Sequence, residues 1–150
     1  VSRTEAKQYI DGYFENYPGV LQFMNETKEK AKSQGYVETV LGRRLYLPQI
    51  NSKNKMLQQH ALRTAINAPM QGSSADIIKK AMLNIQHWID TEGHEIKMFM
   101  QVHDELVFEI NSEKADEYAN KIKLMMSNAL KLHIPLEVDI GIGSNWQEAH

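Results

Sequence analysis

The sequence contains no cysteine and only four prolines in 150 residues. Without cysteine the chain can form neither a disulfide framework nor a zinc–thiolate site, and nothing favours an oxidising compartment. The sequence also lacks an apolar run that approaches the roughly 20 residues of a membrane span, and its polar N-terminus lacks the apolar core of a signal peptide. We therefore expect a soluble, cytoplasmic protein that makes no contact with membranes.

The composition does not favour a disordered chain. Hydrophobic residues make up 42% of the sequence and charged residues 24%, whereas disordered chains combine low hydrophobicity with high net charge. A chain of this length can form one core, or two subdomains that share a boundary. Because the first residue is Val1 rather than methionine, the chain could be either a processed chain or an excised piece, with upstream sequence missing.

Basic residues are concentrated in the first half of the chain, although the net charge is only −2. Residues 1–75 hold 10 basic and 6 acidic side chains, and residues 76–150 hold 7 and 13. Since nucleic-acid binders neutralise phosphates with lysine and arginine, this division favours a local cationic surface. The alternative is that some lysines only solvate a helix face. The concentrated basic residues are Lys28, Lys30, Lys32, Arg43, Arg44, Lys53, Lys55 and Arg63.

Two helices and a small hairpin are expected at the start of the chain. Apolar spacing predicts a helix over residues 2–15, capped by a serine or threonine, and a second helix over residues 20–34. Gly35 is well placed to end the second helix. Two β-like runs, residues 36–40 and 44–47, flank a glycine-containing turn and predict a hairpin.

The rest of the chain predicts helices that cover an antiparallel sheet. Residues 53–92 have a helical pattern, but Pro69 lacks a backbone N–H and is expected to kink or break it into two segments. Residues 97–110 predict a β-hairpin with a polar tip. Ser112 is expected to cap a helix that ends near residue 131. Alternating apolar residues predict a last strand over residues 136–142, and together these elements indicate an α+β fold.

The tip of the predicted hairpin carries the first candidate site. A tight turn would hold the adjacent carboxylates Asp104 and Glu105 at the end of a sheet, with little freedom to avoid each other. Mg²⁺ takes oxygen ligands and keeps several waters for substrate phosphates, as two-metal phosphoryl transfer requires. The alternative is that polar residues simply occupy a solvent-facing turn.

The remaining histidines share no metal-ligand spacing and are expected at the surface or in the core: His60, His87, His94, His133 and His150.

A polar ridge on the long helical segment is the second candidate site. Arg63, Asn67 and Gln71 are four residues apart, Ser74 returns to nearly the same face, and the neighbouring residues are small. Small neighbours let DNA approach closely, and neutral amides can donate to the minor-groove acceptors that A·T and T·A pairs share. Arg63 could add a phosphate or minor-groove contact. The alternative is an ordinary exposed helix face.

Several stretches resemble one family in the correct order. Residues 100–109, which contain Val-His-Asp-Glu, resemble motif C of family A DNA polymerases of the bacterial DNA polymerase I type. Residues 63–79 are similar to the family's Ala-Ile-Asn-x-Pro-x-Gln-Gly segment. Residues 42–48 resemble its Gly-Arg-Arg element, and the Gly-Ser-Asn-Trp stretch at residues 143–146 agrees as well. The resemblance covers nearly the whole chain.

The resemblance implies roles for individual residues. Asp104 would be a catalytic metal ligand, Glu105 a supporting catalytic carboxylate, and His103 a DNA contact at the primer end. Arg63, Asn67 and Gln71 would bind DNA. The implied cofactor is Mg²⁺, with two ions in the intact enzyme, and the implied partners are primer-template DNA and deoxynucleoside triphosphates. Arg43 and Arg44 could serve either DNA binding or structure.

The resemblance also implies part of a polymerase right hand. Residues 1–55 would be the C-terminal part of the fingers, and residues 56–150 the C-terminal part of an antiparallel palm built on the motif C hairpin and the last strand. The family's Asp-Tyr-Ser-x-x-Glu-x-Arg motif, which carries a second metal aspartate, does not occur in the chain. Its Arg-x-x-x-Lys-x-x-x-Phe/Tyr-Gly helix, which grips the triphosphate, is also missing.

Three functional hypotheses follow. The first is a fragment of a monomeric DNA-directed DNA polymerase, a nucleotidyltransferase of DNA replication and repair, which is inactive as an isolated chain. The second is a non-catalytic module that binds the DNA minor groove. The third is a metal-dependent phosphohydrolase built on the Asp-Glu turn, which would leave the helix ridge as a coincidence.

Overall fold

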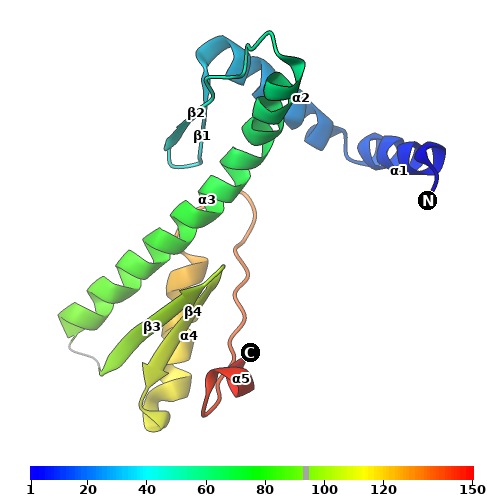
Figure 1. Ribbon diagram of the computed structural model, residues 1–150. Helices are drawn as coiled ribbons and strands as arrows, with labels where there is room; N and C mark the ends of the chain where they lie inside the picture. The colour runs from blue at the N-terminus through cyan, green and yellow to red at the C-terminus, as the bar shows by residue number, and fades with distance from the viewer. Residues whose placement is uncertain (93–94) are drawn as a thin grey trace. The chain divides into compact units, whose positions relative to one another are not determined.

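The computed structural model describes residues 1–92 and 95–150, which form two compact units, Val1–Ser73 and Ser74–His150 (Figure 1). The division lies inside one long helix, α3 (Lys55–Glu92). Each unit has its own cluster of buried side chains. The expectation for His94 lies outside the described residues. None of the helices in the described part of the chain is both long and apolar enough to cross a membrane.

The first unit begins with two consecutive helices, α1 (Arg3–Asn16) and α2 (Pro18–Gln34), as predicted. Ser2 caps α1 in a capping box: its side chain accepts from the backbone N–H of Glu5, and the Glu5 carboxylate accepts from the N–H of Ser2. Hydrogen bonds to the Glu5 carboxylate from the backbone of Ser2, and next from its side chain, lower the pKa of Glu5. A proline at the first position of α2 has a backbone already suited to a helix.

Gly35 ends α2 and leads into the predicted hairpin. Its φ of 79° is the left-handed conformation that a helix C-cap commonly needs and that glycine adopts without steric cost. The strands β1 (Tyr36–Glu38) and β2 (Arg44–Tyr46) then pair antiparallel. The core of this unit joins α2, the hairpin region and α3 through Ala31, Val37, Leu47, Ile50, Ala61 and Ala65.

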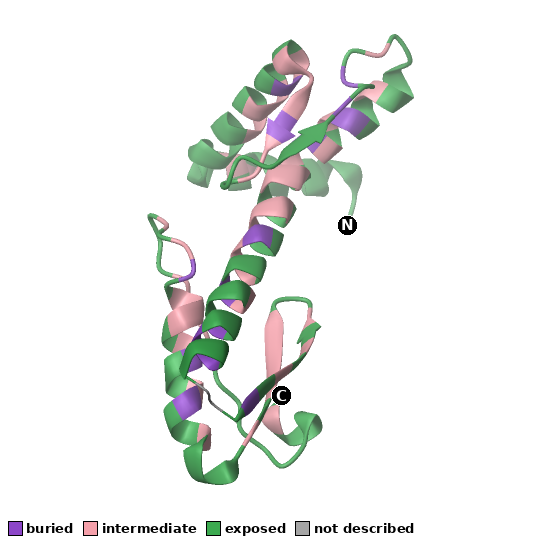
Figure 2. Ribbon diagram, turned by 90° about the vertical axis from the view of Figure 1, so that its left-hand side faces the viewer, coloured by how far each residue is buried: buried purple, intermediate pink, exposed green. Residues whose placement is uncertain are grey.

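The prediction that Pro69 would break the long helix into two segments is wrong, because α3 continues through it. A proline inside a helix removes one backbone hydrogen bond and costs about 3 kcal/mol. Packing on both sides of the proline offsets this cost. Ala61 and Ala65 are buried before it, and Ile85 is buried after it. In Figure 2, buried positions recur along α3 between exposed ones.

The second unit contains the predicted hairpin, formed by β3 (Ile96–Val102) and β4 (Glu105–Ile110). The strands pair antiparallel from Ile96 with Ile110 to Val102 with Glu105, with a register shift between Met98 and Met100. Apolar side chains from α3, the hairpin and α4 (Ala115–Ser127) form the core. Its buried members are Ile85, Trp88, Ile89, Ile96, Tyr118 and Ile122. The expected α+β fold, with helices that back an antiparallel hairpin, is therefore confirmed.

The helix after the hairpin differs from its prediction at both ends. The side chain of Asn111, rather than Ser112, caps the 3₁₀ turn η1 (Ser112–Lys114), which precedes α4. Asparagine caps about as well as serine, and here its side chain accepts from the backbone N–H of Glu113. The helix ends at Ser127 instead of near residue 131. There Asn128 donates its side-chain amide to the Leu124 carbonyl, a local bond that competes with helix continuation.

Residues 136–142 do not form the predicted last strand of the palm sheet. In the part of the chain that the structure describes, both sheets have two strands, and residues 136–142 pair with neither. Period-two alternation favours extended backbone, but a strand also requires a neighbouring edge that offers hydrogen bonds. Leu136 and Val138 are half-buried, whereas Ile140 and Ile142 are exposed. The chain then ends in the short helix α5 (Trp146–Ala149).

Candidate functional site

The turn between β3 and β4 consists of His103 and Asp104, because Val102 and Glu105 are already paired. Hairpin turns of two residues that match the twist of the strands need a positive φ at the first central residue. His103 has that conformation, with φ 51°, which is uncommon for a residue with a side chain. Gln101 donates to the His103 carbonyl oxygen at 2.9 Å. The hairpin thus fixes the backbone that carries the exposed Asp104 side chain.

Glu105 lies in a different environment from Asp104. It is the first residue of β4 and is half-buried, and its Oε1 lies 3.2 Å from Nδ1 of His150. The sequence pattern did not indicate this partner, since His150 was expected to have no role at a site. Its position after the Gly-Ser-Asn-Trp stretch was the only sequence signal available.

A closed turn at the C-terminus brings His150 to Glu105. The Glu148 carboxylate accepts from the backbone N–H and hydroxyl of Ser144, at 3.0 and 2.6 Å, and from the Asn145 amide at 2.8 Å. These hydrogen bonds lower the pKa of Glu148. The bonds from Ser144 have the largest effect on the pKa, and the bond from Asn145 has a smaller one. Gly141 permits the closure, because a Cβ atom there would overlap the Ala149 carbonyl oxygen.

The carboxylates of the turn fit part of a magnesium site. No group of three histidine, aspartate or glutamate side chains that could hold a metal occurs in residues 1–92 and 95–150. Mg²⁺ is commonly bound by one or two protein carboxylates together with waters and substrate phosphates. Asp104, with Glu105 beside it, offers that smaller set of oxygen ligands.

The ridge on α3 lines an open groove of about 340 Å³ in the first unit. The exposed side chains of Arg63, Asn67 and Gln71 all contribute to it, so the structure brings these three predicted residues together. Ser74 is exposed but belongs to the second unit. The groove is completed by residues that the sequence interpretation did not include: Leu45, His60, Thr64 and Ala68. Helical spacing could have indicated His60, which is three residues before Arg63.

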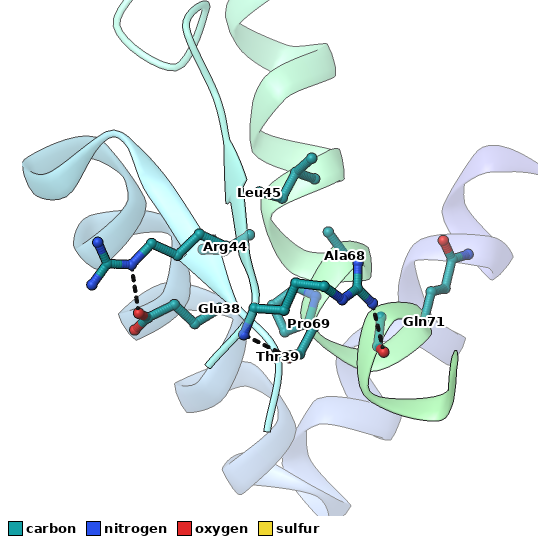
Figure 3. Close-up of a pocket in the computed structure, with 10 residues that line it drawn as sticks. Glu38, Thr39, Arg44, Leu45, Ala68, Pro69 and Gln71 are labelled. Atoms are coloured by element: carbon teal, nitrogen blue, oxygen red, sulfur yellow. Dashed lines mark hydrogen bonds and ion pairs between the residues drawn. The ribbon is translucent and has the colours of Figure 1, made fainter. Parts of the chain in front are cut away.

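A second cavity of about 190 Å³ lies where the β1–β2 hairpin meets α3 (Figure 3). Leu45, Ala68 and Gln71 line both this cavity and the groove, so the two are neighbours. Its wall contains both arginines whose role the sequence left open, Arg43 and Arg44.

Both arginines make intramolecular contacts. Arg44 Nε lies 3.0 Å from Glu38 Oε1, and its guanidinium carbon is 4.5 Å from the centre of the Tyr36 ring. A dashed line in Figure 3 marks the ion pair between Arg44 and Glu38. The hydrogen bond with Glu38 is the largest cause of a raised pKa of Arg44. Arg43 donates from Nη2 to the Gly72 carbonyl oxygen at 3.0 Å. These contacts favour structural roles for both side chains.

Comparison with known families gives a match over almost the whole sequence. The family described as DNA polymerase family A matches residues 1–148. The chain belongs to DNA polymerase family A. This membership confirms the resemblance seen in the sequence motifs.

Bacterial members of family A are similar along the full chain. The DNA polymerase I of Pseudomonas aeruginosa is 51% identical over 150 residues, which is all of this chain and 16% of that protein. The DNA polymerase I of Streptococcus pneumoniae is 45% identical over 149 residues, which is 99% of this chain and 17% of that protein. The chain therefore spans about a sixth of the length of these relatives.

One solved structure has the same fold as this chain. It is described as the POL domain of Pol1 from M. smegmatis in complex with DNA primer-template and dNTP. The two are 42% identical with a TM-score of 0.96, and the match covers 99% of this chain and 26% of the other. The likeness agrees with part of a polymerase right hand. The roles of the individual site residues remain predictions.

Proposed function

We propose that this chain forms part of a DNA-directed DNA polymerase that adds deoxynucleotides to a primer 3′-OH in DNA replication and repair. The observation that carries the proposal is the shared groove of Arg63, Asn67 and Gln71, in a chain that belongs to DNA polymerase family A. Residues 1–55 would come from the fingers and residues 56–150 from the palm. The partners would be primer-template DNA and deoxynucleoside triphosphates.

The groove supplies duplex binding in this proposal. The amide groups of Asn67 and Gln71 are exposed on one side of α3 and can donate to minor-groove acceptors without selecting a sequence. Arg63, in the same groove, would contact a phosphate or the groove floor. The first unit carries 10 basic and 6 acidic side chains, which favours attraction of a polyanion. An enzyme that copies any sequence needs this kind of contact.

The hairpin turn supplies a metal ligand. Asp104 would hold Mg²⁺, Glu105 would support it, and His103 would contact the primer end. When bound, Mg²⁺ activates the attacking oxygen and neutralises charge on the phosphate oxygens. The two-residue turn holds the Asp104 backbone in place, so little reorganisation would be needed when substrate arrives.

The isolated chain is expected to bind duplex DNA without extending a primer. It lacks the family's second metal aspartate and its triphosphate-gripping helix, so Asp104 would hold a metal pair poorly. The test is incubation of the purified chain with primer-template, all four deoxynucleoside triphosphates and Mg²⁺. Clear metal-dependent extension would contradict the proposed incompleteness.

The groove is tested in the complete gene product, meaning the whole protein that carries this segment. The double variant Asn67→Ala/Gln71→Ala should bind primer-template about tenfold more weakly or worse, because each lost base contact costs about 1–3 kcal/mol. The matched control is Gln8→Ala/Asn25→Ala, which removes the same residue types from exposed positions outside the groove.

Three outcomes separate the candidate functions. The groove variant is Asn67→Ala/Gln71→Ala. If it binds primer-template more weakly and extends the primer more slowly, while Gln8→Ala/Asn25→Ala behaves like the unmodified protein, the polymerase proposal is supported. Salt-dependent duplex binding by a complete gene product that never extends a primer would favour the non-catalytic module. Unchanged binding by the groove variant would refute the role of the groove.

A further inference from the structure

The loop that joins β1 and β2 is attached to α3 by side-chain and backbone groups. Arg43 Nη2 donates to the Gly72 carbonyl oxygen at 3.0 Å, and the backbone N–H of Val40 donates to Ser73 Oγ at 2.8 Å. Thus two hydrogen bonds join positions about 30 residues apart in sequence. The contact lies entirely within the first unit.

The loop presents Arg43 in a defined direction. The Thr39 hydroxyl accepts from the backbone N–H of Arg43 at 3.1 Å, and the Thr39 carbonyl accepts from that of Gly42 at 2.9 Å. Gly42 has φ 80°, a conformation that suits glycine. Hydrogen bonds within the turn therefore hold the backbone of Arg43 in place.

Gly72 allows the loop to approach the helix closely. A Cβ atom at this position would lie 2.6 Å from Thr39 Cγ2 and 3.3 Å from Arg43 Nη2. The first distance is shorter than packed carbon atoms can adopt, so a side chain at Gly72 would force the Thr39 side chain to shift. Helix interiors disfavour glycine by about 1 kcal/mol relative to alanine. The close approach is a physical reason for a glycine here.

The attached hairpin forms part of the DNA groove. Leu45 on β2 lines the groove beside Asn67 and Gln71, and Gln71 directly precedes Gly72. The position of Leu45, and the surroundings of Gln71, therefore depend on how the loop is fastened to α3. Arg43 makes one of the long-range hydrogen bonds of that fastening.

We propose that Arg43 is a positioning residue that fastens the β1–β2 hairpin to α3 and thereby sets the wall of the groove beside Gln71. This inference rests on the proposed function, in which the groove receives the duplex. Arg43 acts through Gly72 and Leu45, and the duplex itself is contacted by the ridge. It is thus distinct from a phosphate-binding arginine, although its side chain is exposed.

The salt dependence of binding separates these roles. In the complete gene product, Arg43→Gln should weaken primer-template binding about tenfold, since a lost charge-assisted hydrogen bond has effects of that size. The slope of log K against log salt should stay as in the unmodified protein. A phosphate contact would instead reduce the slope by about 0.9 to 1. The charge-matched control is Arg3→Gln, at an exposed position in α1, outside both the groove and the concentrated basic residues.

A readout without DNA tests the fastening directly. Hydrogen exchange of the peptide that spans residues 36–46 should be faster in Arg43→Gln than in the unmodified protein or in Arg3→Gln. Because no DNA is present, this measurement can succeed even if the groove variant disproves the proposed function. A reduced salt slope, or exchange and affinity equal to those of Arg3→Gln, would overturn the inference.

A second pair of variants reaches the same contact from the helix. Gly72→Ala should weaken binding and speed exchange of the hairpin peptide, because its Cβ would meet Thr39 Cγ2. Adding Thr39→Ser removes that methyl group, retains the hydroxyl that accepts from Arg43, and should restore both readouts. A merely destabilised variant would not be rescued in this way. The proposal would be contradicted if Thr39→Ser did not restore both readouts, or if Gly72→Ala left hydrogen exchange of the hairpin peptide unchanged.

Discussion

His103 and Asp104 are the whole connection between β3 and β4, and so each atom of the turn has little freedom. For residues other than glycine, the left-handed conformation that His103 adopts costs about 1–2 kcal/mol. Strained backbone of this kind concentrates at functional sites, where the surrounding structure holds it. The strain at His103 therefore agrees with a role for the turn, which the family membership also favours.

Replacement of Asp104 tests the metal-ligand assignment. In the complete gene product, Asp104→Asn should lower kcat by more than about 100-fold, because even partners of metal ligands affect activity 10–100-fold. Primer-template affinity should change little, since the groove is intact. Glu105→Gln is the comparison variant and should have the smaller effect. Steady-state extension and a binding titration provide the measurements. A near-normal kcat in Asp104→Asn would exclude Asp104 as a catalytic ligand.

Glu148 predicts a pH-dependent opening of the C-terminal turn. Its pKa is lowered by hydrogen bonds from Ser144 and Asn145. A lowered folded-state pKa means that the stabilisation is fully present above the ordinary value of 4.5 and is lost as the pH falls through the lowered pKa. The amide proton of Ser144, followed by NMR, should report this transition. Glu148→Gln should abolish the pH dependence, and a transition that persists in this variant would point to another group.

At the scale of elements, α3 shows how packing overrides a local preference. Its 38 residues include Pro69, yet the helix is continuous. Local rules correctly assign a cost to the proline but do not include the buried contacts of the turns on either side. By contrast, caps are local devices, and Ser2 and Gly35 could be assigned from the sequence.

Substitution of Pro69 should stabilise the helix. Pro69→Ala restores an N–H that can donate to the Ala65 carbonyl, so the unfolding free energy should rise by up to about 3 kcal/mol. Loss of ring contacts in the cavity that Pro69 lines would reduce this gain. Met70→Ala, at the exposed neighbouring position, should change stability by less than about 0.5 kcal/mol. Urea unfolding of both variants measures the change in the free energy of unfolding. A Pro69→Ala variant less stable than the unmodified protein would show that the ring contacts contribute more than the restored hydrogen bond.

At the scale of the whole molecule, buried side chains gather in two clusters, one in each compact unit. The unit boundary falls within α3, so the same helix contributes to both cores. The first unit contains the groove and the second contains the hairpin turn. Stability of the two candidate regions therefore depends on different sets of contacts.

Core truncations should reveal this division. Ile85→Ala should destabilise the second unit by about 2–5 kcal/mol, because it removes a fully buried side chain. Leu47→Ala is the counterpart in the first core. Hydrogen exchange resolved by peptide should show faster exchange mainly within the unit that carries each substitution. Equal acceleration throughout the chain in both variants would mean that the units unfold as one.

The sequence by itself determined the family and the order of the main helices and both hairpins, and it indicated Asp104 and the ridge of Arg63, Asn67 and Gln71 as candidate site residues. These features depend on local periodicity, caps and short motifs, which neighbouring residues specify. Only the tertiary structure decided that α3 passes through Pro69, that residues 136–142 remain unpaired, and that Arg43 is bound to Gly72. It also joined Leu45 to the groove and His150 to Glu105. Each of these outcomes depends on contacts between residues distant in the chain, whose packing no local pattern encodes.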